Sequence, residues 1–234
     1  MSFDALCQQA WAANRELLRA GLVCLTFGNA SAVDRASGVL AIKPSGIPAA
    51  ALTVEDMVVV SIATGEVVAG RNRPSSDTPA HVVIARAFPA VGGIVHTHSR
   101  AAVAWAQAHR PIPCLGTSHA DHFRGAVPVT RPLDPAEIAA DYEAATGRVI
   151  VEAFEGLDPV DVPAVLVRDH GPFTWGPTAD AAVTNAIALE LVAAIAIDTL
   201  ALGGPGGPIA AELLERHHGR KHGPRATYGQ GPTA

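Results

Sequence analysis

The sequence predicts an α/β fold in which a mostly antiparallel sheet is covered by helices. Two apolar runs, 57–62 and 66–68, flank Ala63-Thr64-Gly65, a pattern typical of a β-hairpin. Farther along, apolar strands mix with segments of helical periodicity, and hairpins before such a mixture favour antiparallel pairing. Apolar residues make up 49% and charged residues 17% of the 234 residues, which is enough for a large core. We therefore expect one domain spanning 1–234, with a tail at 219–234.

The first third of the chain predicts a helix followed by short strands. Apolar residues recur at helical spacing over 4–20, namely Leu6, Ala10, Ala13, Leu17 and Leu18. Strands are expected at 23–27, 31–34 and 39–42, separated by turns at Gly28-Asn29 and Ser37-Gly38. The hairpin at 57–68 follows.

The remainder predicts an alternation of helices and strands. We expect helices at 77–87, 99–108, 178–202 and near 207–217, and another that Asp134 caps. Strands are expected up to His98 and at 163–168. The run 179–202 is long and apolar, but Asp180, Asn185, Glu190 and Asp198 interrupt it, which favours a buried core helix over a membrane span.

Composition argues against several classes of partner and compartment. A net charge of −5 gives no basic surface for nucleic acid. The three cysteines, Cys7, Cys24 and Cys114, form no C-x-x-C pair and fit a reducing compartment. The N-terminus begins with Phe3-Asp4 and is amphipathic from there on, so we expect no signal peptide, which would have a basic region followed by an apolar core. We expect a cytoplasmic protein that binds neither nucleic acid nor membrane, with some apolar surface buried between subunits.

Histidines at strand ends predict a metal site. His96 and His98 are two residues apart after an apolar run, so on a strand both imidazoles face one point. His170 follows the run 164–167 and precedes Gly171-Pro172, which reads as a turn. Asp77 is a fourth candidate, although it also suits the first turn of a helix, and His81 ranks below these four. Three imidazoles, with or without a carboxylate, suit zinc, cobalt, nickel or manganese, while paired histidines also occur in ordinary half-buried strands.

Seven short motifs follow one another along the chain. In chain order they are Leu25-Thr26-Phe27-Gly28-Asn29, Ile42-Lys43-Pro44-Ser45-Gly46, Pro74-Ser75-Ser76-Asp77-Thr78-Pro79, Gly93-Ile94-Val95-His96-Thr97-His98-Ser99, Thr117-Ser118-His119-Ala120-Asp121, His170-Gly171-Pro172-Phe173 and Tyr228-Gly229-Gln230. Together these motifs resemble the class II aldolase/adducin family, most closely its L-ribulose-5-phosphate 4-epimerase branch. The resemblance implies a three-layer α/β/α sandwich and a cyclic homotetramer. It also implies Zn²⁺, replaceable by Mn²⁺ or Co²⁺, held by Asp77, His96, His98 and His170. The sequence has neither a G-x-G-x-x-G motif nor a Walker loop, so we expect no nucleotide cofactor.

The reaction implied by the resemblance is the interconversion of L-ribulose 5-phosphate and D-xylulose 5-phosphate, as in arabinose catabolism. Cleavage of C3–C4, rotation of the aldehyde and re-addition would invert C4, with the metal stabilising the enediolate. The resemblance nominates Asp121 and Tyr228 as the two proton handlers, and Tyr228 would reach a neighbouring subunit's site from the tail. On its own, Asp121 also reads as a turn residue, and a tail position such as Tyr228 is commonly disordered.

The same motifs offer groups for a phosphate. Gly28-Asn29, Ser45-Gly46 and Ser75-Ser76 supply backbone N–H groups and hydroxyls, and the serine pair lies at a helix start that favours anions. Lys43 and His217 would add positive charge, although solvated positions are an ordinary alternative for both.

Two other functions remain open from the sequence. A fuculose- or rhamnulose-phosphate type of aldolase would use the same metal site and release an aldehyde and dihydroxyacetone phosphate. Such aldolases usually carry glutamate where this chain has Asp77, which favours the epimerase. An adducin-like interaction module is the non-enzymatic alternative. The chain departs from the epimerase pattern at Phe27, His122 and Arg168-Asp169, which leaves the exact sugar phosphate open.

Overall fold

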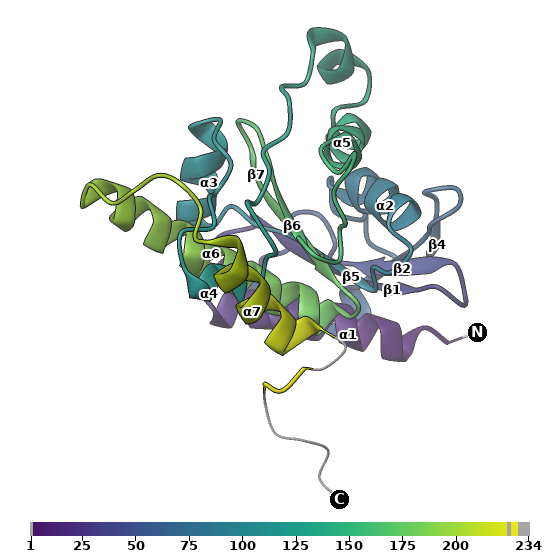
Figure 1. Cartoon of the computed structure of the whole chain (residues 1–234). Helices are drawn as coiled ribbons and strands as arrows, with labels where there is room; N and C mark the ends of the chain where they lie inside the picture. The colour runs from purple at the N-terminus through teal and green to yellow at the C-terminus, as the bar shows by residue number, and fades with distance from the viewer. Residues whose placement is uncertain (1, 224–225, 229–234) are drawn as a thin grey trace, which may run out of the picture.

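The architecture is an α/β fold built on one antiparallel sheet, as expected (Figure 1). The computed structural model describes residues 2–223 and 226–228. Seven strands pair in the order β4-β3-β2-β1-β5-β7-β6, with every neighbouring pair antiparallel. Their bounds are β1 Asn29–Asp34, β2 Val39–Ile42, β3 Val58–Ser61, β4 Val67–Ala69, β5 Gly93–His96, β6 Ala164–Val167 and β7 Gly171–Gly176. The hairpin expected around 63–65 is confirmed as β3–β4.

Helices cover both faces of the sheet and produce three layers. They are α1 Asp4–Arg19, α2 Thr78–Ala87, α3 Arg100–Gln107, α4 Thr117–Ala120, α5 Pro135–Glu152, α6 Ala179–Ala201 and α7 Ala211–His222, with 3₁₀ turns at Ala49–Ala51 and Val54–Asp56. Helices α2 and α5 pack together over one face, and α1 with the first half of α6 covers the other (Figure 1). Each face buries its own apolar cluster, so the sheet is apolar on both sides.

Strand β1 shows how the sheet presents polar groups at one edge of the core. Asn29 and Ser31 face α2, where they contact Asp77 and His81, whereas the alternate residues of β1 pack with α1. Asn29 is paired directly with His96 of β5. The alternation therefore places His96 on the α2 side of the sheet, beside Asn29.

The expected strand at 23–27 is wrong. This segment forms a turn in which the Phe27 N–H donates to the Cys24 carbonyl at 3.0 Å. Leu25 has φ 54 and Gly28 has φ 78, both in the left-handed region that a strand excludes. Leu25 is 76% exposed, so the apolar residue that suggested a buried strand in the sequence lies at the surface.

The Gly-Pro turn expected after His170 is also wrong. Gly171 and Pro172 begin β7, which lies between β5 and β6 inside the sheet. The Pro172 carbonyl accepts from the Thr97 N–H at 3.3 Å, so Pro172 contributes an acceptor where it has no N–H to donate. His170 therefore occupies the tight β6–β7 turn.

The last helix lies farther along the chain than expected. It runs over Ala211–His222 instead of 207–217, because Gly206, Gly207 and Pro208 are poor helix formers. Basic residues at 220–222 suit the negative end of the helix dipole. Residues 219–222 thus belong to α7, and residues 224–225 and 229–234 of the expected tail lie outside the described residues.

Helix α6 combines a buried face with an exposed apolar stripe. By length and composition it is one helix that could cross a membrane, yet it packs on β5 and β7 in the core. Glu190, one of the charged residues of α6, has a structural role. Its carboxylate accepts from the N–H groups of Ala101 and Ala102 at 2.8 and 3.0 Å and so caps α3. One turn apart along the other side, three apolar residues are exposed: Ile187, Leu191 and Ile195.

Candidate functional site

Three histidines meet at one end of the central strands. His96 ends β5, His98 follows it just beyond the strand, and His170 lies in the β6–β7 turn. The Nε2 atoms of His96 and His98 are 3.0 Å apart. One ring nitrogen from each of the three histidines lies within 4.8 Å of the other two. We call His96, His98 and His170 the histidine cluster.

Backbone contacts orient His96 within this cluster. Its Nδ1 lies 3.0 Å from the Pro172 carbonyl oxygen, which can only accept, so Nδ1 carries the proton. The lone pair is then on Nε2, the atom directed at His98. The Phe173 ring stacks on His96 at 4.4 Å between centroids, and the Phe27 ring stacks on His98 at 5.4 Å. These neighbours hold the rings in an arrangement that fits a metal ion, since neutral imidazole nitrogens are common ligands.

Tyr142 supports the third histidine. Its hydroxyl lies 3.2 Å from His170 Nδ1. Helix α5 is kinked immediately before it, at Asp141, where φ is −158 and ψ is 81. The sequence reasoning missed Tyr142, because a tyrosine within an expected helix carries no motif that links it to a histidine 28 residues away.

The histidine cluster is electrically neutral near neutral pH. Burial lowers the pKa of His96 well below its ordinary value, and His170 and His98 lower it further. Burial also lowers the pKa of His98 and of His170. Neutral imidazoles do not have to lose a proton before they bind a metal.

Asp77 lies beside the histidine cluster and outside its tight group. Its carboxylate accepts from Asn29 Nδ2 at 2.6 Å, and its negative charge partly opposes the lowering of the pKa of His98 and of His170 by burial. Asp77 is also the N-cap residue of α2, although its side chain makes no capping hydrogen bond there. The carboxylate is thus near enough to act on both imidazoles.

His81 does not join the histidine cluster. Its Nδ1 is hydrogen-bonded to Ser31 Oγ at 2.8 Å, and its ring packs edge-on against Phe173. Burial lowers the pKa of His81 to about 3. It lies outside the cluster as a neutral, fully buried residue.

Three of the expected phosphate-binding residues, Asn29, Lys43 and Ser75, adjoin Asp77. Asn29 donates to Ser75 Oγ at 3.1 Å, and the Ser75 N–H donates to the Lys43 carbonyl at 3.0 Å. The Lys43 ammonium is buried, and within residues 2–223 its hydrogen bonds are long ones of 3.4 Å to the carbonyls of Thr26 and Pro44. Burial lowers the pKa of Lys43, and the charge of Asp77 opposes that shift.

Gly28, Ser45, Gly46 and Ser76, also expected to bind phosphate, lie around the same place, whereas His217 contacts Asp121 instead. A Cβ at Gly28 would lie 2.9 Å from the His96 carbonyl, so only glycine fits there. Ser45 and Gly46 follow Pro44, which forms an isolated bridge with Pro74, and the Ser45 N–H donates to the Arg73 carbonyl. Ser76 is exposed next to Ser75. Segments 28–29, 43–46 and 74–77 therefore converge beside the histidine cluster.

The remaining site residues form a separate group, which we call the Asp121 cluster: Asp121, His217, Arg220, Lys221 and Tyr228. Asp121 ends the short helix α4 and accepts from His217 Nδ1 at 3.0 Å and from Arg220 Nη2 at 2.9 Å. Tyr228 lies over the cations, with its ring centroid 4.5 Å from Lys221 Nζ and 5.4 Å from Arg220 Cζ. Within residues 2–223 and 226–228, no hydrogen bond or ion pair joins the Asp121 cluster to the histidine cluster.

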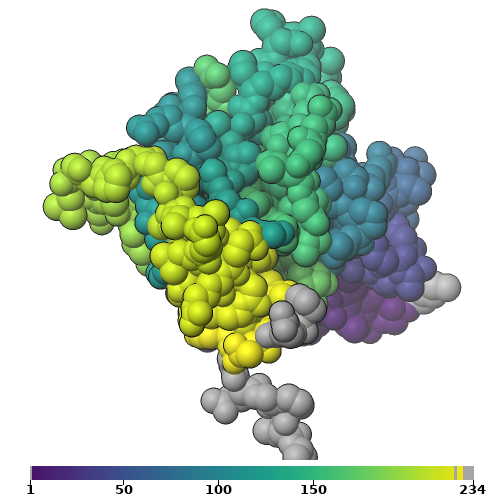
Figure 2. Space-filling model, in the orientation of Figure 1, coloured from purple at the N-terminus to yellow at the C-terminus, as the bar shows by residue number. Residues whose placement is uncertain are grey.

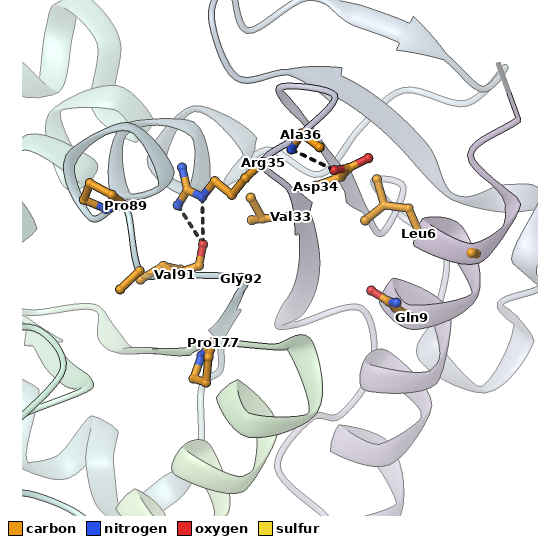
Figure 3. Close-up of a pocket in the computed structure, with 12 residues that line it drawn as sticks. Leu6, Gln9, Val33, Asp34, Arg35, Ala36, Pro89, Val91, Gly92 and Pro177 are labelled. Carbon is orange, nitrogen blue, oxygen red and sulfur yellow. Dashed lines mark hydrogen bonds between the residues drawn. The ribbon is translucent and has the colours of Figure 1, made fainter. Parts of the chain in front are cut away.

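A pocket of about 490 Å³ lies at the opposite end of the sheet and is not part of the site (Figure 3). Arg35 dominates its polar lining, but the guanidinium is engaged by the carbonyls of Ala85, Phe88 and Val91 at 2.6–3.1 Å. Asp34 accepts from the Ala36 N–H at 3.0 Å. This pocket thus presents no uncommitted charged group to a ligand.

Comparison with known proteins yields a family and a set of close relatives. Residues 8–197 match the family model described as Class II Aldolase and Adducin N-terminal domain. The L-ribulose-5-phosphate 4-epimerase UlaF of Salmonella paratyphi B is 48% identical over 223 residues, which are 95% of this chain and 97% of that protein. The protein of the same name from Salmonella typhi has the same identity and coverage.

Solved structures share the fold at lower identity. An L-fuculose 1-phosphate aldolase superposes with a TM-score of 0.79 at 23% identity, covering 94% of this chain and 97% of that chain. An aldolase II superfamily protein from Pseudomonas syringae gives a TM-score of 0.75 at 18% identity, covering 98% and 87%. These two likenesses confirm the three-layer fold.

Proposed function

Because this chain belongs to the class II aldolase and adducin family, we propose that it is an L-ribulose-5-phosphate 4-epimerase that forms D-xylulose 5-phosphate. The observation that carries the proposal is the 48% identity to curated epimerases over nearly the whole of both chains. The aldolase structures share the fold of this chain at about half that identity. The aspartate at position 77, where such aldolases usually carry glutamate, also favours the epimerase. The reaction would cleave the C3–C4 bond, allow the aldehyde to rotate, and re-form the bond with C4 inverted.

A divalent metal, Zn²⁺ in our proposal, would be held by His96, His98 and His170 with Asp77. The neutral nitrogen donors of the histidine cluster and a carboxylate near them make a set that zinc favours. Bound there, the metal would act as a Lewis acid that stabilises negative charge on the ketose oxygens. Asn29 would hold the Asp77 carboxylate in place through its 2.6 Å hydrogen bond.

The anionic end of the substrate would bind at the converging segments 28–29, 43–46 and 75–76. Lys43 offers an ammonium that burial has removed from water, so an anion would recover for it a strong charge-assisted contact. Gly28 and Gly46, both with positive φ, permit the backbone to approach a phosphate closely. The Ser76 hydroxyl is exposed beside these groups.

The Asp121 cluster would supply the proton handlers. Asp121 is an acceptor, because an ionised carboxylate has no proton to donate, and the Tyr228 phenol is a donor. Since the same cations contact both groups, we propose that they come from one subunit and act together on the histidine cluster of a neighbour. His217 would hold the Asp121 carboxylate through its 3.0 Å contact.

The assembly we propose is a homotetramer located in the cytoplasm, in the catabolism of a pentose such as arabinose. The exposed stripe Ile187, Leu191 and Ile195 on α6 supports contacts between subunits, since contiguous apolar surface commonly marks an interface. Leu25 and Phe27, both exposed near the histidine cluster, would be covered by the neighbour. Residues 1–234 would form one domain, with the tail starting after His222.

Incubation with L-ribulose 5-phosphate tests the proposal. The expected product is D-xylulose 5-phosphate, resolved by chromatography or by a coupled assay, without accumulation of free glycolaldehyde phosphate. Release of the two fragments would instead establish the aldolase. If the purified protein binds no divalent metal and alters no sugar phosphate, the adducin-like interaction module is the alternative that remains.

A further inference from the structure

We propose that Arg220 is a positioning residue that clamps the two proton-handling groups together, a role that rests on the proposed function of Asp121 and Tyr228. Arg220 lies in the last turn of α7, between the short helix α4 and the segment 226–228. In Figure 2, α7 forms the yellow surface beside the end of the described chain. Two independent sets of contacts carry the proposal.

The guanidinium of Arg220 holds the Asp121 carboxylate through more than one donor. Nε lies 3.2 Å from Oδ1, and Nη2 lies 3.0 Å from Oδ1 and 2.9 Å from Oδ2. A planar fork that reaches both oxygens fixes the direction of the carboxylate, which a single point charge does not. The Asp121 side chain is only 15% exposed, so this orientation is shielded from water.

The backbone and the guanidinium of the same residue hold Tyr228. The Arg220 carbonyl accepts from the N–H groups of Thr227 and Tyr228 at 2.9 and 3.1 Å. The Tyr228 ring lies 5.4 Å from the guanidinium carbon, within the range of a cation–π contact. Arg220 is thus bonded to the carboxylate on one side and to the tyrosine residue on the other.

The other residues around Asp121 make fewer of these contacts, and of them Lys221 reaches both the carboxylate and the Tyr228 ring. His217 contacts the carboxylate alone, and His222 donates to the Asp121 carbonyl oxygen at 2.9 Å. Lys221 is 3.8 Å from Asp121, and it contacts the Tyr228 ring as a point charge. None of these three also bonds the backbone of 227–228 in the described part of the chain.

Charge from α7 also sets the protonation state of Asp121. Burial would raise the pKa of Asp121, but hydrogen bonds from Arg220 and His217, with the charges of Lys221 and Arg220, lower it overall. Among the described residues, the imidazoles of His122 and His222 also face it. Loss of Arg220 should therefore make Asp121 easier to protonate.

Arg220→Gln and Arg220→Lys, purified with metal, test the clamp against Arg216→Gln. Arg216 is exposed on the same helix and makes no hydrogen bond or ion pair among the described residues, so it is the matched control. We expect Arg220→Gln to lower kcat by about 10²-fold, the low end for one acid–base group. The acidic limb of kcat/KM should move to higher pH by about one unit. Arg220→Lys keeps a positive charge, so the acidic limb of its kcat/KM profile should lie at the wild-type pH while its kcat stays low.

Tyrosine NMR reports the contact without relying on turnover. The chain has two tyrosines, so ¹³C-tyrosine labelling gives two ring signals, and Tyr228→Phe identifies one of them. The Tyr228 signal should shift in Arg220→Gln and stay in place in Arg216→Gln. If wild type is inactive on L-ribulose 5-phosphate while this shift occurs, the proposed function fails and the clamp is supported.

Two results would overturn the proposal. One is an unchanged pH limb together with an unchanged Tyr228 signal in Arg220→Gln. The other is weaker competitive inhibition by inorganic phosphate with the pH limb unmoved, which would make Arg220 a ligand of the substrate phosphate instead.

Discussion

The histidine cluster stands on the sheet, whereas the Asp121 cluster stands on the last helix and the segment after it. Burial keeps the imidazoles of His96, His98 and His170 neutral, and surrounding cations keep Asp121 ionised. Strand pairing fixes the first group through β1, β5 and β7, while side-chain contacts from α7 fix the second. The difference separates a rigid neutral region suited to a metal from a peripheral charged region suited to proton transfer.

The largest effect should follow removal of the histidine cluster's ligands. The double variant His96→Ala/His98→Ala is expected to lose its metal and its activity, because two of three nitrogen donors are gone. Metal content measured by elemental analysis and secondary structure measured by circular dichroism check this. Stoichiometric metal retained in the double variant would show that the site lies elsewhere.

Removing the phenol should be the next largest effect and should leave the metal in place. Tyr228→Phe is expected to lower kcat on the order of 10²–10⁴-fold, the usual contribution of one acid–base group. Mixed with His96→Ala and reassembled, it should regain partial activity, because some interfaces would pair an intact histidine cluster with an intact Tyr228. Verified mixed tetramers without activity would mean that Tyr228 does not serve a neighbouring subunit.

Tyr142→Phe should weaken the metal without touching the proton handlers. For His170 Nε2 to bind a metal, Nδ1 must carry the proton, and the Tyr142 oxygen is its acceptor. Loss of such a partner commonly costs 10–100-fold in metal affinity, and we expect about that loss in a chelator competition. Tyr228→Phe, the same chemical change at the other tyrosine, is the control and should bind metal as wild type does.

Acid should destabilise the metal-free protein through its buried histidines. The pKa of His81 is about 3 and that of His119 about 4, both below the ordinary 6.5. As pH falls, these histidines take up protons in the unfolded chain before they do so in the folded protein. The free energy of unfolding is therefore unaffected by them above pH 6.5 and decreases as pH falls below it. At pH 5 each of the two histidines should lower the free energy of unfolding by about 2 kcal/mol. Urea unfolding of the apoprotein at pH 7.5 and 5.0 measures this loss, and equal midpoints would contradict it.

The class of fold and the gathering of the three histidines follow from local patterns in the sequence. His96 and His98 lie at the end of one apolar run and His170 follows another by three residues, and strand ends at the same edge of a sheet lie close together. Strand β7 escaped prediction because Pro172 near its start reads as a turn. The false strand at 23–27 had the opposite cause, since exposed Leu25 and Phe27 mimic a buried pattern.

Contacts between distant segments could not be predicted. Arg220 reaches Asp121 across 99 residues, and Tyr142 reaches His170 across 28, and neither pair has a characteristic spacing. Such contacts depend on how α5 and α7 pack, which is decided by the whole core. The kink at Asp141 is an example, because no glycine or proline announces it.

Glu190 has a consequence for the segment that carries His98. Residues 97–99 join β5 to α3; β5 is fixed by pairing with β1 and β7, and the start of α3 is fixed by the Glu190 carboxylate. A three-residue span with both ends anchored has little conformational entropy left to lose. His98 is therefore presented preorganised although it lies outside the strand, and a ligand that binds it spends little of its binding free energy on ordering the chain.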